Sequence, residues 1–225
     1  MVFLVLSCTS SEPANRYPNM VANVDPISAG TVEAQFDRLF SSKLNKAEIE
    51  VIFHPRLNAV ALEFRYEMIR YRQFWDEAAR KQFIEALGSY KIDYEARNLT
   101  NRYRKTSSIY GRTRGRLEWE TFRLARTRVS RPVIELGYRF RMDSPYFATL
   151  MRSAKEQDAP TGETPMDSQQ IIMYLTRAQA DELARLFDQT LLVGLLGGRD
   201  TQTGEEPMVD DYLSPPADDN SELKD

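Results

Sequence analysis

The fold is decided by the stretch Val133-Ile134-Glu135-Leu136-Gly137-Tyr138-Arg139-Phe140-Arg141-Met142, in which every even position is apolar. Side chains of a β-strand point alternately to the two faces of a sheet. The even positions therefore predict a buried face, and Glu135, Arg139 and Arg141 predict a face turned to solvent. The same alternation recurs elsewhere in the chain, so a half-buried sheet is the expected skeleton.

Other segments predict further strands around this one. Residues 48–53 and 60–68 alternate in the same way, and the turn residues 54–58 between them predict a β-hairpin. We expect further strands at residues 90–96, 117–124, 146–151 and 170–175.

Three segments predict helices. Apolar residues follow helical spacing in residues 31–44. Asp76 is expected to cap a second helix, which Gly88 is expected to end. Thr176 and Gln179 form a capping-box pattern before a third helix with an apolar stripe. Together these elements predict an α+β domain over residues 31–196, with a mostly antiparallel sheet of about six or seven strands and two or three helices on one face.

The two ends of the chain differ from this domain in composition. Residues 9–30 begin with a polar, proline-containing stretch that suits a tether. Residues 197–225 are acidic and poor in apolar side chains, which predicts a disordered tail because such a segment buries too little surface to offset its ordering entropy.

The first eight residues, Met1-Val-Phe-Leu-Val-Leu-Ser-Cys8, are apolar up to a small residue and the single cysteine of the chain. This stretch resembles the lipobox of bacterial lipoprotein precursors, in which an aliphatic residue and two small or aliphatic residues precede a cysteine. The resemblance implies that residues 1–8 are a shortened signal segment, that Cys8 carries the lipid, and that the protein is anchored to a membrane of the cell envelope. A free thiol at an ordinary hydrophobic N-terminus is the alternative interpretation.

Charge is distributed unevenly along the chain. Residues 97–152 hold 14 basic and 4 acidic residues, a net of +10, whereas residues 154–225 hold 5 basic and 16 acidic residues, a net of −11. Residues 100–116 predict a flexible basic loop. Arginine favours bidentate pairing with carboxylates and phosphates, so the candidate residues for binding an anion or a partner are Arg102, Arg104, Lys105, Arg112, Arg114, Arg116, Arg139 and Arg141.

Two interpretations of these arginines remain open. In the first, they pair across strands with glutamates on a solvated sheet face, namely Glu63, Glu67, Glu95, Glu118, Glu120 and Glu135. In the second, arginines and aromatic residues within residues 97–141 bind nucleic acid. The acidic tail and the overall net charge of −3 favour the first. An acidic envelope partner or anionic lipid headgroups would also suit the basic region if Cys8 is lipidated.

No motif predicts catalysis, a metal site or a cofactor. One cysteine and one histidine, His54, leave no basis for a cysteine zinc cluster, and the sequence holds no phosphate-binding, dinucleotide-binding or metalloprotease motif. Glu118 and Glu120 would share a sheet face, as a glycosidase pair requires, but this pattern is common on exposed strands. The leading hypothesis is a non-enzymatic, lipid-anchored envelope protein; the alternatives are a cytoplasmic nucleic-acid-binding module and an unrecognised hydrolase.

Overall fold

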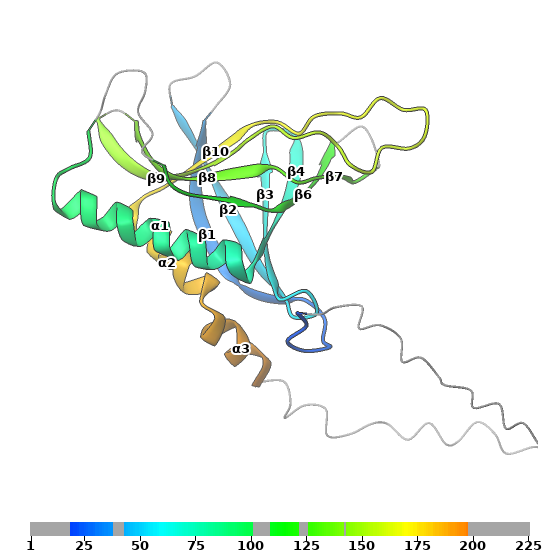
Figure 1. Ribbon diagram of the computed structural model, residues 1–225, viewed down its shortest axis with the longest axis horizontal. Coiled ribbons are helices and arrows are strands. Elements are labelled where there is room, and N and C mark those ends of the chain that lie inside the picture. The colour runs from blue at the N-terminus through cyan, green and yellow to red at the C-terminus, as the bar shows by residue number, and fades with distance from the viewer. Residues whose placement is uncertain (1–18, 38–42, 101–108, 122–125, 142, 198–225) are drawn as a thin grey trace, which may run out of the picture.

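The computed structural model describes residues 19–37, 43–100, 109–121, 126–141 and 143–197, and these residues form one antiparallel sheet with three helices (Figure 1). The sheet has ten strands in the order β5-β8-β9-β10-β1-β2-β3-β4-β6-β7. The strands are β1 (Ile27–Asp37), β2 (Leu44–His54), β3 (Ala59–Tyr66), β4 (Ile69–Asp76), β5 (Ile109–Arg114), β6 (Arg116–Thr121), β7 (Arg128–Ser130), β8 (Val133–Arg141), β9 (Ser144–Met151) and β10 (Ile171–Leu175). The helices are α1 (Glu77–Glu95), α2 (Arg177–Phe187) and α3 (Gln189–Gly197).

Strand β8 confirms the alternation on which the sequence prediction depends. Ile134 and Leu136 are fully buried and Tyr138 is 5% exposed, so the even positions do face the core. Glu135 lies on the opposite face, as expected, but it is itself buried at 8% exposure because two arginines cover it. Met142 lies outside the described residues.

The sheet curls into a half-barrel because two consecutive strands, β5 and β6, pair with different parts of the sheet on either side of a sharp corner. Strand β5 pairs with β8, and after the single residue Gly115 the chain continues as β6, which pairs with β4. The corner thereby brings together the two ends of the sheet, with β5 at one end and β6 and β7 at the other. Gly115 is required there, since a Cβ atom at this position would lie 2.6 Å from the carbonyl oxygen of Phe74.

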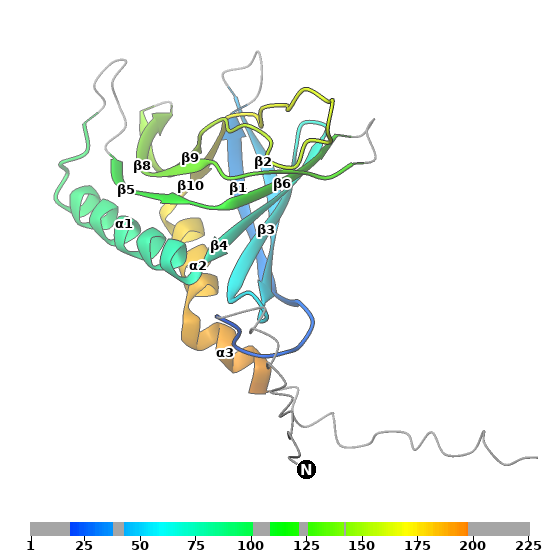
Figure 2. The same cartoon turned by 45° about the vertical axis from the view of Figure 1, so that its right-hand side comes forward.

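Helices α1 and α2 pack against the curled sheet and complete the core (Figure 2). Helix α1 contacts β4, β5 and β8, and α2 contacts β1, β9 and β10. Phe83 of α1 lies 5.1 Å from Phe187 of α2 and 5.2 Å from Phe147 of β9, measured between ring centroids. Trp75 of β4 lies 5.3 Å from Phe187. These aromatic contacts join both helices to two distant parts of the sheet.

The predicted fold class is wrong. The structure is mostly sheet, with ten strands in a curled half-barrel and three helices, rather than an α+β domain of six or seven strands with helices on one face. Several strands were missed because their apolar residues also fit helical or loop patterns. In particular, residues 31–44 were predicted as a helix but form the greater part of β1 and, after residues 38–42, the first residue of β2.

Two further boundaries differ from the prediction. Gly88 does not end its helix, since α1 continues to Glu95 and includes most of the predicted strand at residues 90–96. Burial of Tyr90 against the core stabilises this last part of α1. The predicted basic loop is a strand from Ile109 onward. Strand β1 begins at Ile27, within the range expected to be tether.

Both predicted helix caps and the hairpin are confirmed. Asp76 accepts a hydrogen bond from the backbone N–H of Ala79 at 2.8 Å. Thr176 and Gln179 form the reciprocal capping box that their spacing predicted. Strands β2 and β3 pair directly across the turn that follows His54. These features depend on neighbouring residues alone, which explains why local sequence patterns predict them.

The segment between β9 and β10 folds back on the edge strand β7. The N–H of Gln157 donates to the carbonyl oxygen of Val129 at 2.8 Å, and the N–H of Val129 donates to Asp158 Oδ1 at 2.9 Å. The buried carboxylate of Glu156 lies 3.6 Å from Arg128 and also bonds Arg126. The segment therefore covers a strand edge that would otherwise offer free backbone groups to another chain.

Candidate functional site

A group of arginines surrounds one buried glutamate on the outward face of β5, β8 and β9. Glu135 pairs in register with Arg112, and its carboxylate lies 3.4 Å from the guanidinium of Arg112 and 2.8 Å from that of Arg152. Arg114 is exposed, two positions along β5 from Arg112, and has no acidic partner among the described residues. We call Arg112, Arg114, Glu135 and Arg152 the cationic cluster, since it holds three positive charges and one negative charge.

A second charged group, on β3, β4 and β6, is balanced, because its three arginines lie among three glutamates, the third of which, Glu120, pairs in register with Arg70. Glu63 lies 2.6 Å from Arg70 and 2.5 Å from Arg72. Glu118 lies 3.4 Å from Arg72 and 2.7 Å from Arg116. The contacts of Arg70 and Arg72 are cross-strand pairs of the kind that the sequence predicted as one interpretation of its arginines, whereas Arg116 and Glu118 lie on the same strand.

The pKa shift of Glu63 shows that the arginines of this group neutralise its charge. Burial raises the pKa of its carboxyl. Hydrogen bonds from Arg70 and Arg72 and the charges of both guanidiniums lower that pKa by more than burial raises it, so the net shift is downward. Because this charge is matched locally, the balanced group offers less attraction to an external anion than the cationic cluster does.

The two predicted site arginines of β8, Arg139 and Arg141, differ in their contacts. Arg141 forms an ion pair with Asp37 of β1, and its Nε donates to the hydroxyl of Tyr174 at 3.1 Å. The Tyr174 hydroxyl in turn donates to Asp37 at 3.0 Å. Arg139 is half-buried and has no acidic partner in the part of the chain that the structure describes. Arg141 thus links β8 to β1 and β10, whereas Arg139 remains available to bind an external group.

The structure brings together only some of the predicted site residues. Arg112 and Arg114 belong to the cationic cluster and Arg116 to the balanced group. Arg102, Arg104, Lys105 and the predicted lipidation site Cys8 lie outside the described residues. Sequence reasoning missed Arg152, although it follows Ala148 and Leu150 at a spacing of two and so continues the outward face of β9.

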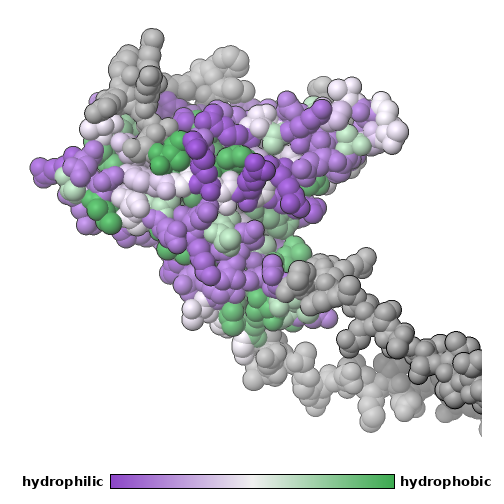
Figure 3. Space-filling view, viewed as in Figure 1, coloured by the Kyte–Doolittle hydropathy of each residue, from purple (hydrophilic) through white to green (hydrophobic). Residues whose placement is uncertain are grey.

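Hydrophilic side chains cover much of the surface of the sheet, whereas apolar side chains gather over α3 (Figure 3). Among the described residues, no helix is long and apolar enough to span a bilayer. The same residues contain no group of three or more His, Cys, Asp or Glu side chains placed to share a metal ion.

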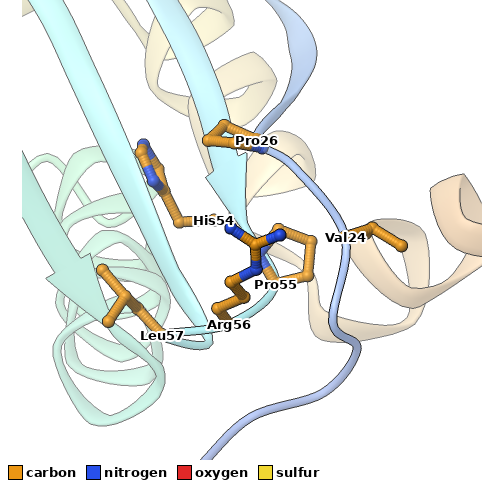
Figure 4. Close-up of a pocket in the computed structure, with 6 residues that line it drawn as sticks. All are labelled: Val24, Pro26, His54, Pro55, Arg56 and Leu57. Atoms are coloured by element: carbon orange, nitrogen blue, oxygen red, sulfur yellow. The ribbon is translucent and has the colours of Figure 1, made fainter. Parts of the chain in front are cut away.

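A pocket of ≈ 160 Å³ lies between residues 24–26 and the loop after β2 (Figure 4). His54 lines it, and its ring packs edge-on against Phe74 at 5.2 Å. Burial lowers the pKa of His54, and the charge of Arg72 lowers it further, so the ring is neutral at pH 7. The pocket is smaller than the range of about 300–1,000 Å³ typical of ligand sites. Its lining residues are Val24, Pro26, His54, Pro55, Arg56 and Leu57.

Comparison with known proteins identifies relatives but no solved structure. A protein of Treponema pallidum (strain Nichols) described as uncharacterized is 24% identical over 184 residues, covering 79% of this chain and 64% of that relative. The chain therefore spans less than two thirds of the length of this relative. No solved structure matches the chain. A family described as an uncharacterised Treponema protein matches residues 27–193, from the first residue of β1 into α3. Since the match covers more than half of the chain, the chain belongs to this family of Treponema proteins.

Proposed function

We propose that the protein is a non-enzymatic, lipid-anchored component of the bacterial cell envelope that binds an acidic protein partner through the outward face of its sheet. Acyl chains on Cys8 would hold the protein at the membrane, and the cationic cluster would contact the partner. The observation that carries the binding role is the excess of arginine over glutamate on β5, β8 and β9.

The geometry of the cationic cluster supports recognition of carboxylates. Glu135 is held between Arg112 and Arg152, which restrains both guanidiniums. Arg114 lies beside them with no acidic partner among the described residues. An incoming carboxylate can therefore pair with a guanidinium that is already positioned, at a smaller cost in side-chain entropy than a free arginine would require.

Lipid anchoring is tested first and separately. Intact mass spectrometry of the protein purified from its native cell would report an acylated Cys8, and the protein would partition into the detergent phase. An unmodified Cys8 would overturn the anchoring part of the proposal without affecting the binding part.

Binding is tested with a peptide of ten glutamates as the probe. We expect the double variant Arg112→Gln/Arg114→Gln to bind it roughly tenfold more weakly, because each charge-assisted contact contributes about 1.5–3 kcal/mol before screening by salt. Arg65→Gln/Arg177→Gln is the matched control, since it removes the same charge from exposed arginines of β3 and α2 that lie outside the cationic cluster and have no acidic partners among the described residues. Equal weakening in both double variants would show that only net charge matters and would overturn the proposed site.

Nucleic acid is the alternative ligand, and the same measurement distinguishes it. A single-stranded oligonucleotide of ten nucleotides would bind more tightly than the peptide, and its affinity would fall steeply with salt. That result would replace the acidic protein partner with nucleic acid.

A further inference from the structure

We propose that the apolar surface of α3, at the end of the domain where the loop after β2 also lies, rests on the lipid bilayer to which the protein is anchored. This inference rests on the proposed anchoring through Cys8 and adds the orientation of the domain on the membrane. It assigns a bilayer surface as the partner of one end of the molecule.

The first observation is the composition of α3. Its nine residues, Gln189–Gly197, include no charged side chain. Leu192 is buried, but Val193 is 43% exposed, and Leu191, Leu195 and Leu196 are only partly buried. Figure 3 shows the resulting apolar area over α3. Exposed apolar areas of this kind mark contacts with a protein or a membrane.

The neighbouring helix α2 shows that this composition is particular to α3. Helix α2 also lies at the surface, but its outer face carries Asp181, Glu182 and Arg185, and Glu182 and Arg185 form an ion pair at 2.7 Å. An amphipathic helix that faces water is expected to show such a polar face. Helix α3 lacks one, which favours an apolar environment for it.

The second observation is the place where the chain enters the domain. The N–H of Val21 donates to the carbonyl oxygen of Pro55 at 2.9 Å, and Arg56 bonds Asn23 at 2.9 Å, so this segment runs along the loop after β2. Figures 1 and 2 both place this segment and α3 at the same end of the half-barrel. The same loop carries Leu57, which is 45% exposed, and Arg56, which forms an ion pair with Asp25 at 3.3 Å.

The path from Cys8 to the domain is short. Asn19 follows Cys8 by 11 residues, which span at most about 40 Å when fully extended. An acyl chain on Cys8 would therefore keep the α3 end of the domain close to the bilayer. This tethering raises the effective concentration of the apolar surface at the membrane, so a modest apolar area suffices for contact.

The surface is also held rigidly. The buried guanidinium of Arg80 in α1 donates to the carbonyl oxygens of Asn58 at 3.0 Å and Trp75 at 3.2 Å. The same guanidinium bonds the side chain of Gln189, the first residue of α3. Arg80 therefore connects α3 and the loop after β2 to the core.

The test places a fluorescent label at either end of the domain. Val193→Cys puts the label on α3, and Met68→Cys puts it on the turn between β3 and β4 at the opposite end, where Met68 is 76% exposed. The acylated protein from the native cell is reconstituted into phosphatidylcholine vesicles that contain nitroxide-labelled lipid. We expect quenching of the label at residue 193 and not at residue 68.

A second variant gives an independent measurement. Val193→Asp is expected to weaken binding to phosphatidylcholine vesicles about tenfold relative to Val193→Thr, which keeps the side-chain shape without the charge. Because Val193 is exposed, neither change should unfold the domain.

The outcomes separate this inference from the proposed function. Acylated protein without quenching at residue 193 would overturn the membrane contact and leave the anchor intact. Protein without an acyl group and without quenching would overturn both. If the label at residue 193 is shielded from solvent in the absence of vesicles, and the protein in solution has twice the mass of one chain, the surface would be assigned to a second copy of the chain instead.

Discussion

Gly115 is the position at which one added methyl group should have the largest calculable effect on the half-barrel. In Gly115→Ala the new Cβ would lie 2.6 Å from the carbonyl oxygen of Phe74 and 3.2 Å from Cδ1 of Ile134. The first of these atoms belongs to the backbone of β4, so it cannot move without disturbing the pairing of β4 with β6. Overpacking of this kind costs about 1–3 kcal/mol. Alanine restricts the unfolded chain and returns about 0.4–1 kcal/mol, so we expect a net destabilisation of about 1–2 kcal/mol.

Urea unfolding, followed by tryptophan fluorescence, measures this change. A loss of about 1–2 kcal/mol should lower the urea midpoint by roughly 0.5–1 M and the melting temperature by about 2–8 °C.

The matched control is Gly88→Ala, the same substitution in α1, where a Cβ would meet nothing within 4 Å. It should stabilise the protein by up to about 1 kcal/mol, because alanine has the higher helix propensity. If Gly115→Ala were as stable as the original protein, the close approach of β4 to the corner would not limit the fold, and the reasoning would be refuted.

Three further predictions concern buried and half-buried polar side chains. Arg80→Ala should lower the free energy of unfolding by about 3–5 kcal/mol, because it leaves buried carbonyl oxygens unpaired and opens a cavity; a loss below about 1 kcal/mol in urea unfolding would contradict this. Glu156→Gln should release the segment between β9 and β10 from β7, because the buried Arg128 loses its counter-charge. Limited proteolysis would detect that release, and the exposed Glu163→Gln should show none. His54 is the single histidine, and burial lowers its pKa below 6.5, so the unfolded state binds the proton more readily and stability should fall as the pH drops below about 6.5. Urea unfolding at pH 7.5 and 5.5 should show a smaller difference in His54→Asn, and an unchanged difference would assign the effect to other groups.

Local patterns predicted the elements whose stability depends on near neighbours. The alternation in β8 correctly identified its buried face, and the Asp76 cap and the capping box at Thr176 were both correct. The patterns failed where one set of apolar residues fits two periods. Val32 and Phe36 are four residues apart, which suits both a helix face and alternate positions on a strand. Pairing with β2 and β10 selects the strand.

The candidate site was predicted in part. The sequence indicated an arginine-rich outward face and its pairing with glutamates, and the structure places Arg112 beside Glu135 as that interpretation expects. It did not indicate that Arg152 completes the cationic cluster, because Arg152 lies 40 residues from Arg112 in the sequence and meets it only through the pairing of β5, β8 and β9. The apolar α3 surface was missed because the sequence predicted one longer helix with Leu191 on its buried stripe, whereas the structure has two helices, α2 and α3.

The sequence by itself determined the period of several strands such as β8, the N-terminal caps of α1 and α2 and the uneven distribution of charge, because each depends on residues close together in the chain. Only the tertiary structure decided the number of strands, the curl of the sheet and which arginines have no acidic partner within the described part of the chain. The curl depends on Gly115 lying against Phe74, 41 residues away in sequence. Contacts between residues so far apart in sequence are selected by the packing of the whole core, where the free energy of burial outweighs local secondary-structure propensity by several kcal/mol.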